Sequence, residues 1–154
     1  MKSFRLKGEA EQEAFGGRLS EVVGDNALIF LEGDLGAGKT TLVRGFLHAR
    51  GHAGSVKSPT YTLIEPYQPE GKAIYHLDLY RLGDPEELEY LGLREMLEEE
   101  AVLLVEWPQR GLGWLPAPDL VVALEYAAGG AARKVVLRPF SSVGEKIISR
   151  LSAT

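Results

Sequence analysis

One short stretch in the first third of the chain constrains the fold more than any other. Residues 33–40 read Gly-Asp-Leu-Gly-Ala-Gly-Lys-Thr and match the phosphate-loop pattern G-x-x-x-x-G-K-S/T at every fixed position. The apolar run 27–31 precedes the loop and has strand length, while residues 41–48 follow it with apolar side chains at helical spacing. A strand before the loop and a helix after it are the context that this motif requires. The stretch therefore predicts an α/β fold that binds a nucleoside triphosphate.

The residue types of the loop explain how it would hold phosphate. Its glycines allow backbone conformations that turn N–H groups toward an anion, and the helix that starts near Lys39 adds the positive end of its dipole. Lys39 would reach the β- and γ-phosphates and take part in catalysis, while the Thr40 hydroxyl would help to hold Mg²⁺. We expect the whole loop to contact the nucleotide: Gly33, Asp34, Leu35, Gly36, Ala37, Gly38, Lys39, Thr40 and Thr41.

Composition excludes several other classes of protein. The 154 residues, of which 45% are apolar and 25% charged, are typical of one soluble globular domain, which we expect to span residues 1–154. The sequence has no apolar run of membrane-spanning length and no apolar signal core, so we expect no membrane association and no export. The absence of cysteine excludes disulfides and thiolate metal sites and fits a cytoplasmic location. A net charge of −5 argues against tight non-specific binding of nucleic acid.

The charge is unevenly distributed. Residues 84–100 contain eight acidic residues and one basic residue, Arg94. Such a block is usually the solvated face of a helix, but it also fits a surface that docks a partner.

Apolar periodicity and turn residues predict an alternation of helices and strands. We expect helices at 9–23, 40–49, from Asp84 to about 100 with an interruption at Gly92, and 143–151, and strands at 27–32, 61–64, 73–80, 101–105, 120–126 and 133–137. Pro59 and Pro66 flank the 61–64 strand and favour an edge position, while Gly129-Gly130 would join the last two strands as a hairpin. The fold class is therefore α/β, a P-loop NTPase-like three-layer sandwich with a mixed, mainly parallel sheet and a C-terminal β-hairpin. Its ligand should lie beyond the carboxyl ends of the parallel strands.

Mg²⁺ bound to a triphosphate usually needs an acidic group at the end of a second apolar strand. Glu106 ends the apolar run 102–105 and is the better candidate for a metal ligand, because a buried central strand would bring its last carboxylate beside the phosphate loop. Asp78 then becomes the candidate that orients the attacking water or supports the metal ligands. The structural alternatives are a solvated strand-end acid for Glu106 and an ion pair with Arg81 for Asp78.

Two further features have both a functional and a structural interpretation. Residues 58–63 contain three hydroxyl side chains and a tyrosine, and they are either a segment that senses the γ-phosphate or an ordinary turn before an edge strand. His76 shares a strand face with Asp78 and is either a substrate contact or a hydrogen-bonded structural histidine.

Five motifs together resemble the TsaE (YjeE) family, the ATPase component of bacterial tRNA threonylcarbamoyladenosine biosynthesis. They are the phosphate loop with the threonine that follows it, Ser-Pro-Thr-Tyr-Thr-Leu at 58–63, His-Leu-Asp-Leu-Tyr-Arg at 76–81, Asp-Pro-Glu-Glu at 84–87 and Val-Glu-Trp-Pro at 105–108. The resemblance runs in unbroken order from about residue 9 to the C-terminus, and its middle motifs are more specific than the phosphate loop alone.

This resemblance implies an ATPase that is weak alone and acts with the TsaD and TsaB components of a threonylcarbamoyl transferase complex. ATP hydrolysis would reset that complex between turnovers, with tRNA contacted indirectly or weakly. Lys39 would contact phosphate, Thr40 and Glu106 would ligate Mg²⁺, and Asp78 would be catalytic. The resemblance also implies nucleotide contacts from Trp107, from an acidic residue of the N-terminal segment, here Glu9 or Glu11, and from a basic residue of the hairpin, here Arg133 or Lys134.

Three other functions use the same loop. A GTPase typically carries a K-x-D element, and none of the seven lysines is followed two residues later by aspartate. A small-molecule kinase needs an acceptor site and usually an arginine-bearing lid, for which 154 residues leave little room. An ATP-binding switch, whose hydrolysis is incidental, would need the same residues as the ATPase.

Overall fold

The computed structural model describes residues 1–127, 130 and 132–152. Within these residues a seven-stranded sheet has the order β1-β7-β6-β2-β5-β4-β3. Its strands are β1 (Lys2–Lys7), β2 (Ala27–Glu32), β3 (Ile64–Tyr67), β4 (Ala73–Asp78), β5 (Ala101–Glu106), β6 (Leu120–Tyr126) and β7 (Ala132–Pro139). The α-helices are α1 (Gly8–Val22), α2 (Lys39–Ala49), α3 (Glu87–Tyr90), α4 (Leu93–Glu98) and α5 (Ser142–Ser152), and short 3₁₀ turns cover Pro69–Gly71 and Pro108–Gly111.

The middle of the sheet is parallel and its edges are antiparallel. The neighbours β6, β2, β5 and β4 run parallel, whereas β3 pairs antiparallel with β4, and β7 pairs antiparallel with both β6 and β1. The predicted mixed sheet and the pairing of the two C-terminal strands are confirmed. Gly129, half of the predicted hairpin turn, lies outside the described residues.

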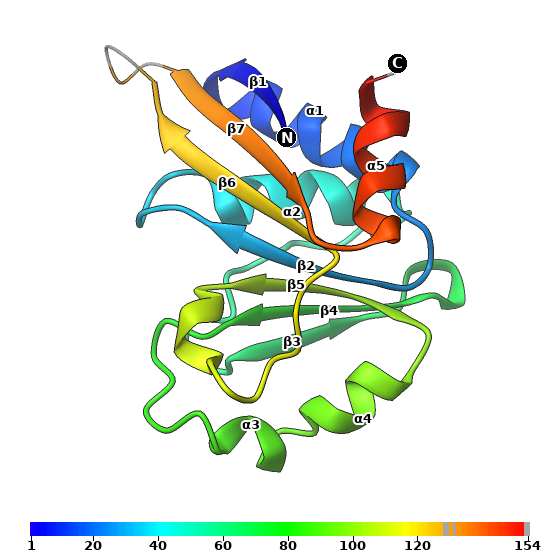
Figure 1. The fold of residues 1–154 in the computed structure, drawn as a ribbon, viewed down its shortest axis with the longest axis vertical. Coiled ribbons are helices and arrows are strands. Elements are labelled where there is room, and N and C mark those ends of the chain that lie inside the picture. The colour runs from blue at the N-terminus through cyan, green and yellow to red at the C-terminus, as the bar shows by residue number, and fades with distance from the viewer. Residues whose placement is uncertain (128–129, 131, 153–154) are drawn as a thin grey trace.

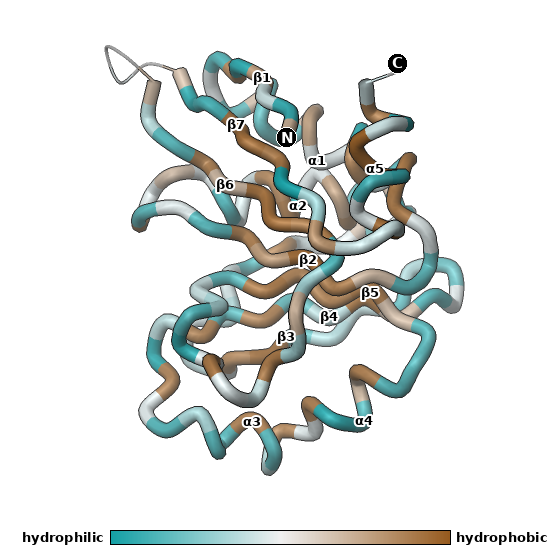
Figure 2. The backbone as a smooth tube through the Cα atoms, viewed as in Figure 1, coloured by the Kyte–Doolittle hydropathy of each residue, from teal (hydrophilic) through white to brown (hydrophobic). Residues whose placement is uncertain are grey.

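Helices cover both faces of the sheet, which confirms the predicted three layers. Figure 1 shows α1, α2 and α5 on one face and the short α3 and α4 on the other. Each helical layer packs on its own cluster of buried apolar side chains, and the two clusters lie on opposite sides of the sheet. All six residues of β5 are buried, as its apolar sequence predicts for a central strand, and the central strands form the most hydrophobic part of the tube in Figure 2.

The structure corrects the prediction at two strands. The extended segment expected at 61–64 is a turn at residues 60–62, where the Leu63 N–H donates to the Pro59 carbonyl at 2.8 Å, and β3 begins only at Ile64. The edge position is confirmed, with Pro66 inside the edge strand itself. The strand expected at 73–80 ends at Asp78. The first strand, β1, was not predicted, although Phe4 and Leu6 alternate with polar residues along it.

The acidic segment 84–100 forms the thin helical layer of α3 and α4. α3 begins at Glu87, three residues after the predicted start at Asp84. Asp84 instead closes the turn before the helix, where its carboxylate accepts the Glu86 N–H at 2.9 Å and the Glu87 carboxylate accepts the Asp84 N–H at 3.2 Å. Gly92, with φ 90°, separates the two helices where the interruption was expected. Among the described residues no helix is long and apolar enough to cross a membrane.

Candidate functional site

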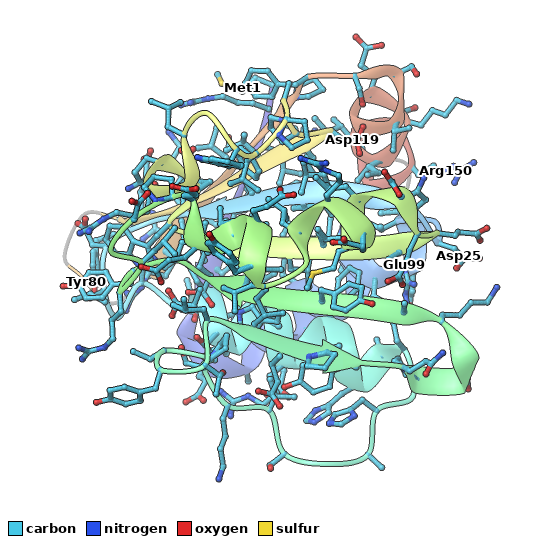
Figure 3. The ribbon with its side chains drawn as sticks, turned by 90° about the horizontal axis from the view of Figure 1, so that it is seen from below. Met1, Asp25, Tyr80, Glu99, Asp119 and Arg150 are labelled. Carbon is cyan, nitrogen blue, oxygen red and sulfur yellow. The ribbon has the colours of Figure 1, made fainter. Side chains whose placement is uncertain are left out.

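Side chains from separate segments meet at one end of the sheet. In Figure 3, Tyr80, which lies two residues after the end of β4, is on the opposite side of the molecule from Asp25 and Glu99. Asp25 lies two residues before the start of β2, and Glu99 lies two residues before the start of β5. The end near Tyr80 is therefore the carboxyl end of the parallel strands, where an open α/β sheet binds its ligand. A cavity of about 490 Å³ opens there, lined by Leu35, Gly36, Gly38, Lys39, Thr40, Thr41, Ser58, Thr60, Asp78, Tyr80, Arg81, Glu106 and Trp107.

The phosphate loop joins β2 to α2, as its flanking residues predicted. Gly38 immediately precedes α2 and has φ 106°, a left-handed conformation that strains any residue with a Cβ. A Cβ at this position would also collide with the amide of Gln12, which reaches the loop from α1 and is 6% exposed. The loop therefore delivers the first turn of α2, whose N–H groups have no partner within the helix, to the wall of the cavity.

Lys39 is the buried cation of the site. Its side chain is 4% exposed, and its ammonium donates to the Gly33 carbonyl at 2.5 Å and lies 4.1 Å from the centre of the Trp107 ring. Burial lowers the pKa of the Lys39 ammonium below 10.5, against the carboxylates of Glu106, Asp78 and Asp34, which raise it. A smaller cavity of about 310 Å³, lined by Glu32, Gly33, Lys39, Trp107 and Gln109, adjoins the first at Lys39 and Trp107.

Glu106 ends β5 next to Thr40, as the strand pattern predicted. The Thr40 hydroxyl lies 3.4 Å from Glu106 Oε2, and the carboxylate is 3% exposed. His76 Nε2 approaches the same oxygen at 2.6 Å from the neighbouring strand. A hydroxyl and a carboxylate are the hard oxygen ligands that Mg²⁺ takes, so this pair fits the ion that the phosphate loop implies.

Asp78 lies at the end of β4, directly opposite Glu106 in the strand register. Its Oδ2 accepts the Ser58 hydroxyl at 3.0 Å, and its Oδ1 accepts the Tyr80 N–H at 3.1 Å. Asp78 makes these two bonds in place of the ion pair with Arg81 that was considered from the sequence. The Arg81 guanidinium instead lies 4.7 Å from the centre of the Tyr61 ring. The segment 58–63 thus reaches the cavity through Ser58 and Thr60 and contacts the candidate catalytic carboxylate.

The hairpin places Arg133 and Lys134 on opposite faces. Arg133 Nε donates to the carbonyl of Ala37 in the phosphate loop at 3.1 Å, and its guanidinium stacks 4.1 Å from the Tyr126 ring. Lys134 lines a separate cavity of about 530 Å³ with Ser3, Phe4, Arg5, Tyr126 and Ala127. The alternation of side chains along β7 therefore brings only Arg133 to the loop, a choice that the sequence left open.

The two acidic candidates of the N-terminal segment lie outside the lining of the main cavity. Glu11 accepts the Lys7 N–H at 2.8 Å at the start of α1. Glu9 pairs with Arg44 at 3.2 Å, and Arg44 also donates to the Thr41 hydroxyl at 3.3 Å. Glu9 is thus linked to the loop through a second side chain, while Glu11 bonds to the backbone at the start of its own helix.

No pattern in the sequence points to Gln12, whose contact with Gly38 depends on how α1 crosses α2. His76 was left between two interpretations, and the structure shows it bonded to Glu106. The signal for His76 is its position two residues before Asp78, which places both side chains on the same face of the strand. Tyr80 belongs to that alternating set, and its ring packs 5.0 Å from the Trp107 ring.

Comparisons with known proteins agree on one family. The family model "Threonylcarbamoyl adenosine biosynthesis protein TsaE" matches residues 6–135. The chain is 50% identical over 125 residues to the tRNA threonylcarbamoyladenosine biosynthesis protein TsaE of Haemophilus influenzae, covering 81% of this chain and 78% of that protein. It is 40% identical over 119 residues to the protein of the same name from Bacillus subtilis, covering 77% and 72%. The crystal structure of YdiB from Bacillus subtilis superposes with a TM-score of 0.84 at 28% identity, covering 99% of this chain and 94% of that one.

Proposed function

The chain belongs to the TsaE family, and from this premise we propose that it is the ATPase of tRNA threonylcarbamoyladenosine biosynthesis. It binds ATP with Mg²⁺ in the cavity beside the phosphate loop and hydrolyses it in the cytoplasm. The observation that carries the proposal is the meeting of Lys39, Thr40, Asp78 and Glu106 around that cavity. These are the cation, hydroxyl and carboxylates that phosphoryl transfer requires in a P-loop protein.

Each of these residues has a role that follows from its surroundings. The loop and the start of α2 bind the phosphate oxygens through backbone N–H groups, and Lys39 exchanges its bond with the Gly33 carbonyl for a phosphate contact. Thr40 and Glu106 would hold Mg²⁺, which supplies charge neutralisation on the transferred phosphoryl group when it is bound. Asp78, held by Ser58 and Tyr80, orients the attacking water and accepts its proton.

We propose that the hydrolysis is weak without partners and is stimulated by the TsaB–TsaD complex, which it resets between turnovers. Two arginines near the site support this. Arg44 is paired with Glu9, and Arg81 lines the cavity but stacks on Tyr61. A charge-stabilising group supplied by a partner is worth about 10³–10⁵ in rate in related phosphoryl transfer reactions. Contact with tRNA would be indirect or weak, since the chain carries a net charge of −5.

The test is release of inorganic phosphate from ATP by the purified protein, with and without the TsaB–TsaD complex. We expect slow turnover alone, stimulation of at least about tenfold by the complex and loss of turnover in Lys39→Ala. No stimulation together with full activity of Lys39→Ala would overturn the proposal. A phosphorylated metabolite in place of free phosphate would indicate the kinase instead.

The same assay separates the ATPase from the ATP-binding switch. Asp78→Ala should bind a non-hydrolysable ATP analogue but hydrolyse no ATP. If this variant still supports tRNA modification through many turnovers of the complex, ATP binding alone performs the function and the hydrolysis is incidental.

A further inference from the structure

His76 is a buried polar side chain whose bonding the proposed reaction does not use. It is 0% exposed and lies in β4, on the strand face that also carries Asp78. Its Nε2 lies 2.6 Å from Glu106 Oε2, and its Nδ1 is buried without a hydrogen-bond partner among the described residues. Buried polar atoms without a partner are rare in folded proteins, so the orientation of this ring needs an explanation.

The direction of the bond between His76 and Glu106 follows from the chemistry of the two groups. An ionised carboxylate has only acceptors, so Nε2 carries the hydrogen and donates it to Oε2. A donor on Nε2 needs the ring in this orientation, which leaves Nδ1 buried and without a partner among the described residues. The unpartnered atom is therefore the cost of placing a donor at Glu106.

This bond restrains a side chain that would otherwise move. A glutamate side chain has three rotatable bonds and can adopt several conformations. Two groups beside Glu106 could each attract its carboxylate: the Thr40 hydroxyl at 3.4 Å and the Lys39 ammonium, whose pKa the Glu106 charge raises. His76 holds Oε2 from the β4 side, and among the described residues no hydrogen bond engages the other oxygen of the same carboxylate, which leaves that oxygen free to bind an ion. A metal ligand that is already oriented by a hydrogen bond from a neighbouring strand loses less conformational entropy when the ion binds.

We propose that His76 is a positioning residue that orients the Glu106 carboxylate for the divalent cation. The inference rests on the proposed function and extends it to a residue that touches neither the nucleotide nor the metal. It assigns His76 an effect on the metal-dependent part of nucleotide binding, separate from the metal-free part that belongs to the phosphate loop.

The test compares two variants by calorimetry with a non-hydrolysable ATP analogue, in Mg²⁺ and in EDTA. His76→Phe fills the space of the ring without a donor, whereas His76→Gln keeps an N–H close to the position of Nε2. The measured quantity is the ratio of the Kd in EDTA to the Kd in Mg²⁺. We expect this ratio to fall by about 10–100-fold in His76→Phe, with the EDTA affinity unchanged, and to recover mostly in His76→Gln.

A double variant tests whether His76 acts through Glu106. Once Glu106→Gln has removed the carboxylate, adding His76→Phe should lower the ratio no further, because the two residues act as one unit. Additive losses would contradict the proposal. So would a wild-type ratio in His76→Phe, a His76→Gln variant as poor as His76→Phe, or an equal fall of affinity in both solutions, which is the mark of a merely structural role.

Failure of the proposed function gives a different result. In that case the wild-type protein binds the analogue in neither solution, and both proposals fall together. Thermal unfolding of each variant shows that it is folded before its binding is measured.

Discussion

Asp78 shows how a single carboxylate can be fixed in place before any ligand arrives. Both of its oxygens accept hydrogen bonds, from Ser58 and from the Tyr80 N–H, and the residue is only 5% exposed. These bonds set the direction of the side chain, and no ion pair among the described residues neutralises its negative charge. The charge and the orientation of Asp78 can therefore be separated by mutation.

The variant Asp78→Asn keeps the shape of the side chain and removes its charge. We expect ATP turnover in the presence of TsaB–TsaD to fall by about 10²–10⁴-fold, the usual contribution of a general base. Binding of a non-hydrolysable analogue should stay within a few-fold of wild type, because the phosphate loop is untouched. Phosphate release and calorimetry measure the two quantities, and a fully active Asp78→Asn would rule out this role for the carboxylate.

Arg133 and Lys134 are neighbours in sequence with different surroundings, so they form a matched pair. Arg133→Ala removes the donor to the Ala37 carbonyl, and leaving a buried loop carbonyl unpaired costs about 1–3 kcal/mol. We expect lower stability toward urea and weaker ATP binding. Lys134→Ala should change the free energy of unfolding by less than about 0.5 kcal/mol, as surface substitutions usually do. Equal effects of the two variants would contradict the placement of Arg133 against the loop.

Among the secondary-structure elements, the helices α1 and α2 cross at close range. This crossing brings α1 to the phosphate loop. A Cβ at Gly16 would collide with the Leu42 carbonyl, and a Cβ at Gly45 would collide with the Glu13 carbonyl. The backbones of α1 and α2 therefore touch directly, which places Gln12 against Gly38. A side chain at either glycine would push α1 away from the loop.

Gly45→Ala tests this crossing, with Gly17→Ala as its control. We expect Gly45→Ala to lower the free energy of unfolding by about 1–3 kcal/mol, the cost of overpacking a well-packed interface. At Gly17 the nearest atoms to a Cβ lie at 3.7 and 3.9 Å, an ordinary contact, so alanine there should stabilise α1 by up to about 1 kcal/mol. Urea unfolding measures both. A neutral Gly45→Ala would mean that the helices can separate without cost.

The sequence predicted the parts of the fold that depend on local pattern. Apolar runs predicted the bounds of β2 and the burial of β5. Gly92 separates α3 from α4, because it has a positive φ of 90° that favours glycine. The strand expected at 61–64 was misplaced because a turn closed by the Pro59 carbonyl overrides β propensity. β1 was missed because a six-residue edge strand is defined by its partner β7, which is remote in sequence.

Some contacts of the candidate site were likewise predictable from local sequence pattern, whereas others depend on the tertiary fold. The contact between Thr40 and Glu106 was predictable, because the loop and the end of a parallel strand must share one edge of the sheet. The choice between Arg133 and Lys134 needed the register of β7, which depends on pairing with β6 and β1. The contact of Gln12 with Gly38 required the crossing of two helices, and no local pattern encodes that crossing.

The whole molecule should respond to its ligand, because the site joins β2, α2, β4 and β5. A ligand that binds only the folded state at about 100 times its Kd adds about 2.7 kcal/mol to the stability. For a chain of this size, MgATP should raise the Tm by roughly 5–10 °C. Thermal unfolding followed by circular dichroism measures the shift. Lys39→Ala should show almost none, and an equal shift in that variant would place the nucleotide elsewhere.

The strand order also has a consequence during synthesis of the chain. Of the seven described strands, β1 is synthesised first, yet the strand that completes its hydrogen bonding, β7, is synthesised last. Until β6 has been synthesised, one border of β2 also lacks its partner strand, and until β7 has been synthesised, β6 has only one of its two neighbours. Non-local pairing of this kind is slow to form. The sheet should therefore be completed only after β7 has been synthesised, and until then its early apolar segments are the ones that need a chaperone.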